Sequence, residues 1–338
     1  MRSIVYSQSG SPDVLRLVDR DIPEPRPGEV RVRVAVSGVN PTDWKSRANG
    51  PMEFAEVTPN QDGAGTVDAV GEGVSVFAVG DRVWVYFSAR NRPTGTAQEY
   101  TVLPVDRVVK LPPGTSFDIG AAMGVPALTA HRALTVLEGG PSRLHPGALD
   151  GTIVLVAGGA GAVGHAAIQL ARWAGATVIT TISTDEKAAL ARAAGAHHIV
   201  NYRTEDAAAA ITSIAPDGVD IVVEVSIVRN AALDAEVVGP RAVVSMYADD
   251  GGDTAAVAIR PNMVKNTRYQ FVLLYTVGDE ALSAAIEDVT TALIAGVLPV
   301  GEQHGLPLVR FPLDQTAAAH QAVQEGVVGK VLIDVESR

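Results

Sequence analysis

A glycine-rich run in the middle of the chain has the spacing of a phosphate-binding turn. Residues 156–167 are VAGGAGAVGHAA, a G-x-G-x-x-G pattern that follows an apolar run and opens an alanine-rich one. A strand before the pattern and a helix after it are the context that dinucleotide binding requires. One glycine makes the tight turn, the next lets the backbone approach a pyrophosphate, and the last brings the helix close to the strand. We therefore expect dinucleotide binding, rather than a turn without a ligand, at Gly159, Ala160, Gly161, Ala162, Val163 and Gly164.

The end of the following strand indicates which dinucleotide binds. An NAD site places an Asp or Glu about 20 residues further on, where it binds the ribose hydroxyls. Here Ser183 and Thr184 occupy that place, and Lys187 follows one turn into the next helix. Hydroxyl and ammonium groups suit a 2′-phosphate. Asp185 and Glu186 count against a phosphate, but acidic residues also suit the first turn of a helix capped by Thr184.

Two residues after the third expected strand support the same choice. Tyr202 and Arg203 end the run HIVNYR, where a loop could cover an adenine or a phosphate. Lys187 could also be an ordinary solvated helix lysine, and this alternative stays open. We expect NADPH as the cofactor.

Composition narrows the class of protein. The chain has 338 residues, of which 47% are hydrophobic and 19% charged, as in folded proteins of about two domains. Its formal net charge of -11 argues against nucleic acids or anionic membranes as partners. It contains no cysteine, so disulfides and thiolate metal sites cannot form. The N-terminal run MRSIVYSQSG turns polar after three apolar residues, so we expect no signal peptide. No run of about 20 apolar residues is present, so we expect no membrane span and a cytoplasmic protein.

The elements that must position these residues change in type along the chain. Short alternating runs predict strands at 29–39, 65–71, 81–87, 97–103 and 107–111. A helical run at 118–137 is expected to break at Pro126. Thereafter strands (152–157, 177–183, 198–202, 219–225, 241–246, 268–277) alternate with helices (162–175, 185–195). This alternation predicts a parallel sheet covered on both faces. The tail is expected to contain helices 279–296 and 314–326, an extended stretch 307–311 and a strand 330–335.

In chain order, these motifs resemble the medium-chain dehydrogenase/reductase superfamily, and within it the zinc-independent quinone oxidoreductase (zeta-crystallin-like) branch. The matching segments are GVNPTDWKSR (38–47), PNQDGAGTVDAVGEGVSVFAVGDRVW (59–84), VPALTAHRAL (125–134), GGAGAVGHAAIQLAR (158–172), GAHHIVNYR (195–203) and GKVLIDV (329–335). The resemblance implies an α/β fold with two domains. One is a GroES-like β-rich catalytic domain, residues 1–123 completed by 298–338. The other is a doubly wound Rossmann NADPH-binding domain, residues 124–297.

The resemblance also bears on metal binding. Zinc enzymes of this superfamily hold the catalytic metal through a Cys, a His and a second Cys. Asn40 stands where the first Cys would be, and Gln61 with Asp62 replaces a His-Glu pair. Amide and carboxylate groups do not replace thiolates in a tetrahedral zinc site. We expect no metal, and hence hydride transfer from NADPH to a quinone or an activated enone, because such an acceptor carries its own electron sink.

Several residue roles follow from the resemblance alone. Asn40 and Thr129 are expected at the nicotinamide end of the cofactor, and Lys330 near the cofactor. The alternatives are an Asx turn before Pro41 for Asn40, a helix threonine bonded to its own backbone for Thr129, and a surface strand end for Lys330. Further cofactor contacts are expected at Ser226, Met246, Tyr247, Phe271 and Leu273.

The proton donor is the least defined role. Many relatives place a tyrosine in the loop after the Asn-Pro motif, where this chain has Trp44 and Lys45. Lys45 is the candidate to polarise a carbonyl oxygen or donate a proton; the alternative is a salt-bridged loop lysine. Trp44 is either a pocket wall or core packing.

Two alternative functions and an assembly are also considered. The chain could instead be an enoyl-thioester or 2-alkenal reductase of the same superfamily, or a non-catalytic, crystallin-like NADPH-binding protein. The apolar run 268–277 has few charges and is expected to pair across a homodimer.

Overall fold

The chain folds into two units, each with its own sheet. The computed structural model describes residues 1–336. Unit 1 contains Met1–Val125 and the chain from Leu308 onward, and unit 2 contains Pro126–Pro307. The return of the C-terminal part to the N-terminal unit is therefore observed, and the α/β fold class is confirmed. The domain limits expected after residues 123 and 297 remain a proposal.

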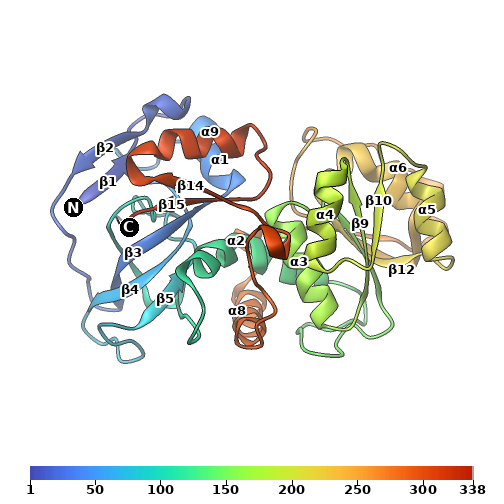
Figure 1. The fold of residues 1–338 in the computed structure, drawn as a ribbon, viewed down its shortest axis with the longest axis horizontal. Coiled ribbons are helices and arrows are strands. Elements are labelled where there is room, and N and C mark those ends of the chain that lie inside the picture. The colour runs from blue at the N-terminus through green and yellow to red at the C-terminus, as the bar shows by residue number, and fades with distance from the viewer. Residues whose placement is uncertain (337–338) are drawn as a thin grey trace. The chain divides into compact units, whose positions relative to one another are not determined.

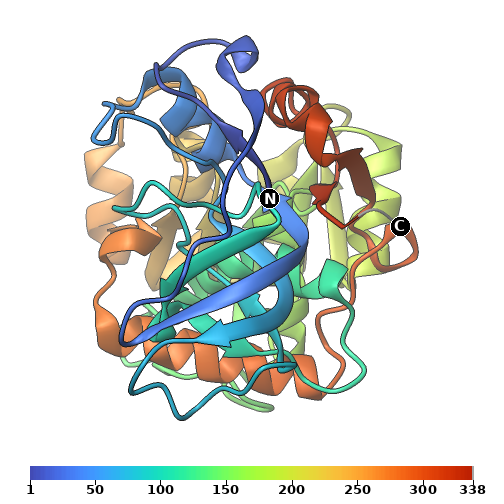
Figure 2. The same cartoon turned by 90° about the vertical axis from the view of Figure 1, so that its left-hand side faces the viewer.

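Unit 1 is built around the long strand β3 (Glu29–Val39). Its alternating valines are buried because every second side chain of a strand faces the same side. Six of the strands are ordered β14-β15-β3-β4-β5-β7, and β6 also pairs with β3. In Figure 2, which turns this unit toward the viewer, β3 is the long blue strand across its front. The strands are β1 (Arg2–Val5), β2 (Arg16–Asp19), β4 (Asp62–Val70), β5 (Arg82–Val85), β6 (Tyr100–Pro104), β7 (Val108–Lys110), β14 (Leu308–Pro312) and β15 (Lys330–Asp334).

The C-terminal strand β15 lies directly against β3. The two strands are antiparallel, with Val331 opposite Val39, so Lys330 comes beside the end of β3. The helices of this unit are α1 (Pro41–Asn49), α9 (Thr316–Gln324) and the first part of α2 (Phe117–Leu134). Figure 1 shows α1 and α9 next to each other beside β14 and β15. Residues 290 positions apart in sequence, such as Asn40 and Lys330, thus meet in one unit.

Unit 2 is a parallel sheet with strand order β10-β9-β8-β11-β12-β13. This is the doubly wound order, whose reversal between β8 and β11 marks the ligand-binding edge of such sheets. Figure 1 shows α4 on one side of the labelled strands and α5 with α6 on the other. The strands are β8 (Ile153–Ala157), β9 (Thr177–Ile182), β10 (His198–Asn201), β11 (Val219–Glu224), β12 (Val238–Met246) and β13 (Arg268–Phe271). The helices are α3 (Ala162–Trp173), α4 (Asp185–Ala194), α5 (Ala207–Ile214), α6 (Ile227–Val237), α7 (Ile259–Lys265) and α8 (Asp279–Ile294).

Three expectations about the elements are wrong. The segment after Asn40 is helix α1 and not a loop, since Pro41 at its first position and Asp43 at its third favour a helix start. Helix α2 continues through Pro126, although the proline removes one backbone donor. Strand β13 ends at Phe271, and a 3₁₀ turn at Leu274–Thr276 replaces the rest of the expected strand.

None of the helices within residues 1–336 has the length and apolar character that crossing a membrane requires.

Candidate functional site

The Asn-Pro motif places a polar cluster at the end of β3. Asn40 is the N-cap of α1, and its backbone N–H donates to the Asp43 carboxylate at 2.7 Å. The other oxygen of Asp43 accepts the Gln61 N–H at 3.1 Å. Asp43 therefore ties the start of α1 to the residue before β4. The Asn40 side-chain amide also bonds more distant groups.

The Asn40 amide lies between a cation and an anion. Its Oδ1 accepts a hydrogen bond from Lys330 Nζ at 2.6 Å, and its Nδ2 donates to Asp62 Oδ2 at 2.7 Å. All three side chains are buried. The surface alternative for Lys330 is therefore wrong, because β15 brings this residue into the interior beside β3.

Helix α2 fixes the carboxylate of Asp62. Its Oδ2 also accepts the Val125 N–H at 2.9 Å. A Cβ added at Gly124 would come within 2.1 Å of Asp62 Oδ1, so only glycine lets the helix backbone approach this closely. The Asp62 Oδ1 atom is buried and forms no hydrogen bond within the described chain.

Burial and charge act against each other in this cluster. Burial raises the pKa of Asp62, while Lys330 and the donors Asn40 and Val125 lower it in part. Burial lowers the pKa of Lys330, and the two carboxylates raise it. Burial and the neighbouring Asp62 raise the pKa of Asp43 to about 8. The Lys330 ammonium thus compensates the charge of the Asp62 carboxylate, and losing it would leave an unpaired buried charge.

These residues do not fit zinc. An amide, a carboxylate and an ammonium replace the thiolate and imidazole donors, and the ammonium itself contacts Asn40. Within residues 1–336, no group of three or more His, Cys, Asp and Glu side chains is arranged to hold a metal.

Trp44 and Lys45 lie on α1, one turn beyond Asn40. Both are half-buried, and Lys45 Nζ is 5.9 Å from the centre of the Trp44 ring. This distance is a cation–π contact. The polar cluster described above does not include Lys45, so its role as a proton donor stays a prediction.

The glycine turn of unit 2 joins β8 to α3. Gly158, which the motif does not include, makes the turn with a left-handed φ of +70°. A Cβ at Gly159 would meet Thr180 at 2.2 Å, and one at Gly164 would meet the Gly158 carbonyl oxygen at 2.5 Å. At Gly161, in contrast, the nearest atom would be 3.5 Å away. The outer glycines therefore allow packing, and the middle one leaves open space.

The start of α3 is suited to an anion. Its N-cap is Gly161, no side chain caps it, and its first turn carries no acidic residue. The first N–H groups of a helix have no partner within the helix, and they carry a partial positive charge. A pyrophosphate can be bound there by Ala162, Val163 and Gly164 through their backbone, so the turn fits a dinucleotide.

The ends of β9 and β10 lie side by side, with Asn201 opposite Ile182. At the end of β9, Lys187 Nζ donates to Ser183 Oγ at 3.4 Å. Thr184 caps α4 by accepting the Lys187 N–H at 3.3 Å. Next to them on the β10 side, Tyr202 is half exposed and its ring lies 5.9 Å from the Arg203 guanidinium carbon. The structure thus brings the five residues expected around a 2′-phosphate or adenine to adjacent strand ends.

At the ends of β11 and β12, a buried acid organises the backbone. The Glu224 carboxylate accepts the Ser226 N–H and the Asn230 side-chain amide, the latter at 2.9 Å. The Tyr247 N–H donates to the Glu224 carbonyl oxygen at 3.1 Å, directly after Met246. Sequence reasoning missed Glu224, although an acid that ends a mostly apolar strand was a visible signal. Burial raises the pKa values of Glu224 and Tyr247.

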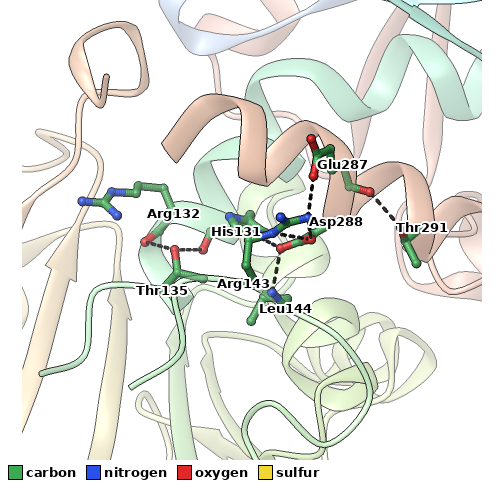
Figure 3. Close-up of polar contacts among 8 residues, drawn as sticks. All are labelled: His131, Arg132, Thr135, Arg143, Leu144, Glu287, Asp288 and Thr291. Carbon is green, nitrogen blue, oxygen red and sulfur yellow. Dashed lines mark hydrogen bonds and ion pairs between the residues drawn. The ribbon is translucent and has the colours of Figure 1, made fainter. Parts of the chain in front are cut away.

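Thr129 lies on the part of α2 that belongs to unit 2, and it is buried. Two residues later, His131 Nε2 lies 2.8 Å from Asp288 Oδ2 on α8, and the same carboxylate binds Arg143 and the Leu144 N–H. Figure 3 shows these groups converging on Asp288. This carboxylate therefore anchors the helix segment that carries Thr129. The sequence predicted no role for Asp288 or for the three residues that bind it.

Phe271 and Leu273 flank the end of β13. The Val272 N–H between them donates to the Met246 carbonyl oxygen at 2.8 Å, whereas the Phe271 side chain is 76% exposed. Val272 is buried, whereas the Leu273 side chain is exposed like that of Phe271.

Comparison with known proteins adds independent findings. Two family models match, the alcohol dehydrogenase GroES-like domain at residues 26–113 and the zinc-binding dehydrogenase at residues 162–291. A quinone oxidoreductase of Lama guanicoe is 33% identical over 98% of this chain and 97% of its own length. A 2-haloacrylate reductase of Burkholderia sp is 29% identical over 94% of this chain and 93% of its own. The structure of Escherichia coli quinone oxidoreductase complexed with NADPH has a TM-score of 0.80 and 25% identity, covering 99% of this chain and 100% of that one.

Proposed function

The chain belongs to the quinone oxidoreductase branch of the medium-chain dehydrogenase/reductase superfamily, and on this premise we propose that it uses NADPH to reduce a quinone or an activated enone. It is an oxidoreductase of the NADPH:quinone reductase type. The relative named 2-haloacrylate reductase extends the acceptor class to an alkene activated by a carboxyl group. One structural observation carries the proposal: a glycine turn with an uncapped helix start follows the central strand of a doubly wound sheet.

When bound, NADPH would supply the hydride. The chain's own residues bind and orient it: the N–H groups at the start of α3 hold the pyrophosphate, and Ser183 with Lys187 holds the 2′-phosphate. The preference for NADPH is supported by the hydrogen bond between these two side chains and by the lack of an acid at the end of β9. Asp185 and Glu186 lie in the first turn of α4, where acids stabilise the helix.

The remaining roles are those that the resemblance implies. Asn40 and Thr129 contact the nicotinamide end, and Ser226, Met246, Tyr247, Phe271, Leu273 and Lys330 complete the cofactor site. A quinone or an enone accepts hydride without a Lewis acid because it delocalises the charge itself. The proton then reaches the acceptor from solvent or from Lys45 Nζ.

We further propose a homodimer, and a cytoplasmic location remains the prediction made from the sequence. The dimer is supported by exposed apolar side chains on α7 and the edge strand β13, namely Ile259, Met263, Val264 and Phe271. Exposed apolar side chains beside an open sheet edge favour pairing with another chain.

The test is NADPH consumption with one ortho-quinone, one 2-alkenal and one enoyl-thioester, with NADH in parallel and with a chelator added. Turnover with the quinone, faster with NADPH than with NADH and unchanged by the chelator, is expected. Turnover with only the alkenal or the thioester would keep the cofactor and move the acceptor to the alternative class. Tight NADPH binding without any turnover would favour the non-catalytic alternative.

A further inference from the structure

Lys330 is a buried lysine with an unusual environment. Within residues 1–336 its ammonium forms one hydrogen bond, to Asn40 Oδ1 at 2.6 Å. An ammonium has three N–H donors, and a buried donor is normally satisfied. Its side chain packs against the backbone of β3, since a Cβ added at Gly38 would come within 3.3 Å of Lys330 Cε. The strand pairing and this packing leave the ammonium little freedom to move.

The two neighbours of Asn40 determine how its amide is turned. Lys330 can only donate and an ionised Asp62 can only accept, so the oxygen must face the lysine and the nitrogen the carboxylate. One N–H and one lone pair of the amide stay available for another group. A free amide can rotate by half a turn and exchange these two functions; this one is held by opposite charges.

We propose that Lys330 is a positioning residue that locks the Asn40 amide in one orientation, so that the amide presents a fixed donor and acceptor to the nicotinamide end of the cofactor. The proposal rests on the proposed function, in which Asn40 makes that contact. Lys330 acts through Asn40 and does not itself touch the reacting atoms.

Lys330 could have a purely structural role instead of orienting the Asn40 amide. Lys330 could merely compensate the charge of Asp62, in which case removing both charges would restore a fully active protein. Three variants distinguish the roles: Lys330→Met, the double variant Lys330→Met with Asp62→Asn, and Lys110→Met as the control. Lys110 is exposed and pairs with Asp81 at 3.1 Å, far in sequence from the cluster.

Stability and kinetics give the first readout. Lys330→Met alone should lower the thermal midpoint, because Asp62 is then buried without a cation. The double variant should regain at least half of that loss. Its kcat should nevertheless stay about 10- to 100-fold below wild type, as expected for a misplaced contact, while its Kd for NADPH should change less than about threefold. A double variant with wild-type kcat would overturn the proposal.

The second readout is independent of turnover. In protein labelled with ¹⁵N-asparagine, the side-chain amide signals of Asn40 are identified by their loss in Asn40→Ser. Slow hydrogen exchange of these signals is expected in the wild type and in Lys110→Met, and faster exchange in Lys330→Met, which keeps the Asp62 acceptor. Unchanged exchange in Lys330→Met would also overturn the proposal. If the wild type reduces none of the acceptors, the proposed function fails, and the amide signals still decide whether Lys330 orients Asn40.

Discussion

The buried carboxyl groups of the two units differ in whether a cation lies beside them. In unit 1, Lys330 provides a cation beside Asp43 and Asp62. In unit 2, Glu224 and Asp234 are buried, and neither forms an ion pair within residues 1–336. Asp234 Oδ2 lacks any hydrogen-bond partner in the described chain. Burial and the charge of Glu224 raise the pKa of Asp234 to about 8. A carboxyl group in this position is best accommodated as the neutral acid.

Asp234→Asn should change the pH dependence of stability. Because the folded-state pKa of Asp234 is raised from 3.8 to about 8, the folded state binds the proton more tightly. Stability from this group is present below pH about 4 and is lost as the pH rises toward 8. Asparagine keeps the shape and cannot ionise. The variant should therefore gain stability over wild type between pH 5 and pH 8, by roughly 2–4 kcal/mol, measured by urea unfolding.

The control for this comparison is Glu236→Gln, an exposed acid on the same helix. Glu224 interacts with Asp234, so the difference between wild type and Asp234→Asn reports the titration of this pair of carboxyl groups. Parallel loss of stability in wild type and Asp234→Asn as the pH rises would show that Asp234 does not hold the proton.

At the scale of elements, one carboxylate joins α2, α8 and the segment before β8. Burial raises the pKa of Asp288, but hydrogen bonds from His131, Arg143 and Leu144 outweigh this effect and lower it to about 2. Figure 3 shows Glu287 reaching the same arginine from the exposed side of α8. Neighbouring acids on one helix thus share a partner but differ in burial.

Asp288→Asn should destabilise the protein by about 2–4 kcal/mol, because the buried His131 loses its charged acceptor and Arg143 loses an ion pair. Glu287→Gln is the matched control, and its effect should stay within about 0–1 kcal/mol because this ion pair is exposed. The depressed pKa means that the Asp288 contribution is present above pH about 4 and is lost as the pH falls toward 2. Equal effects of the two variants in denaturant unfolding would refute the assignment.

The glycine turn allows a second contrast between neighbouring residues. Gly164→Ala places a Cβ against backbone atoms of the turn, whereas Gly161→Ala meets no atom closer than 3.5 Å. Gly164→Ala should therefore lose both stability and NADPH affinity. Gly161→Ala should keep its thermal midpoint and still lose about tenfold or more in affinity, because the methyl group occupies the place of the pyrophosphate. Wild-type NADPH binding by Gly161→Ala, measured by fluorescence titration, would argue against a ligand at this turn.

For the whole molecule, the sequence predicted features that neighbouring residues determine and did not predict contacts between residues far apart in the chain. The glycine turn, the alternation of strands and helices and the cap at Thr184 are properties of neighbouring residues, and the structure has them. The Lys330–Asn40 contact depends on β15 pairing with β3, across 290 positions of sequence. The hydrophobic periodicity of a strand does not indicate which distant strand it pairs with. The same is true of Asp288, whose partners come from elements more than 140 positions earlier.

The exposed surface around β13 predicts that the chain assembles into a dimer. Strand β13 is the last of its sheet, and among residues 1–336 it pairs with β12 alone, so its outer edge is open to another chain. On α7 beside it, Met263 and Val264 are 63% and 69% exposed. Light scattering at micromolar concentration should give twice the chain mass of 35.1 kDa. Met263→Glu combined with Val264→Glu should give the monomer, because paired like charges would be buried at the interface. Val79→Glu, at a valine 67% exposed in unit 1, should leave the dimer intact. A monomeric wild type would exclude this assembly, and a dimeric double variant would place the interface on another surface.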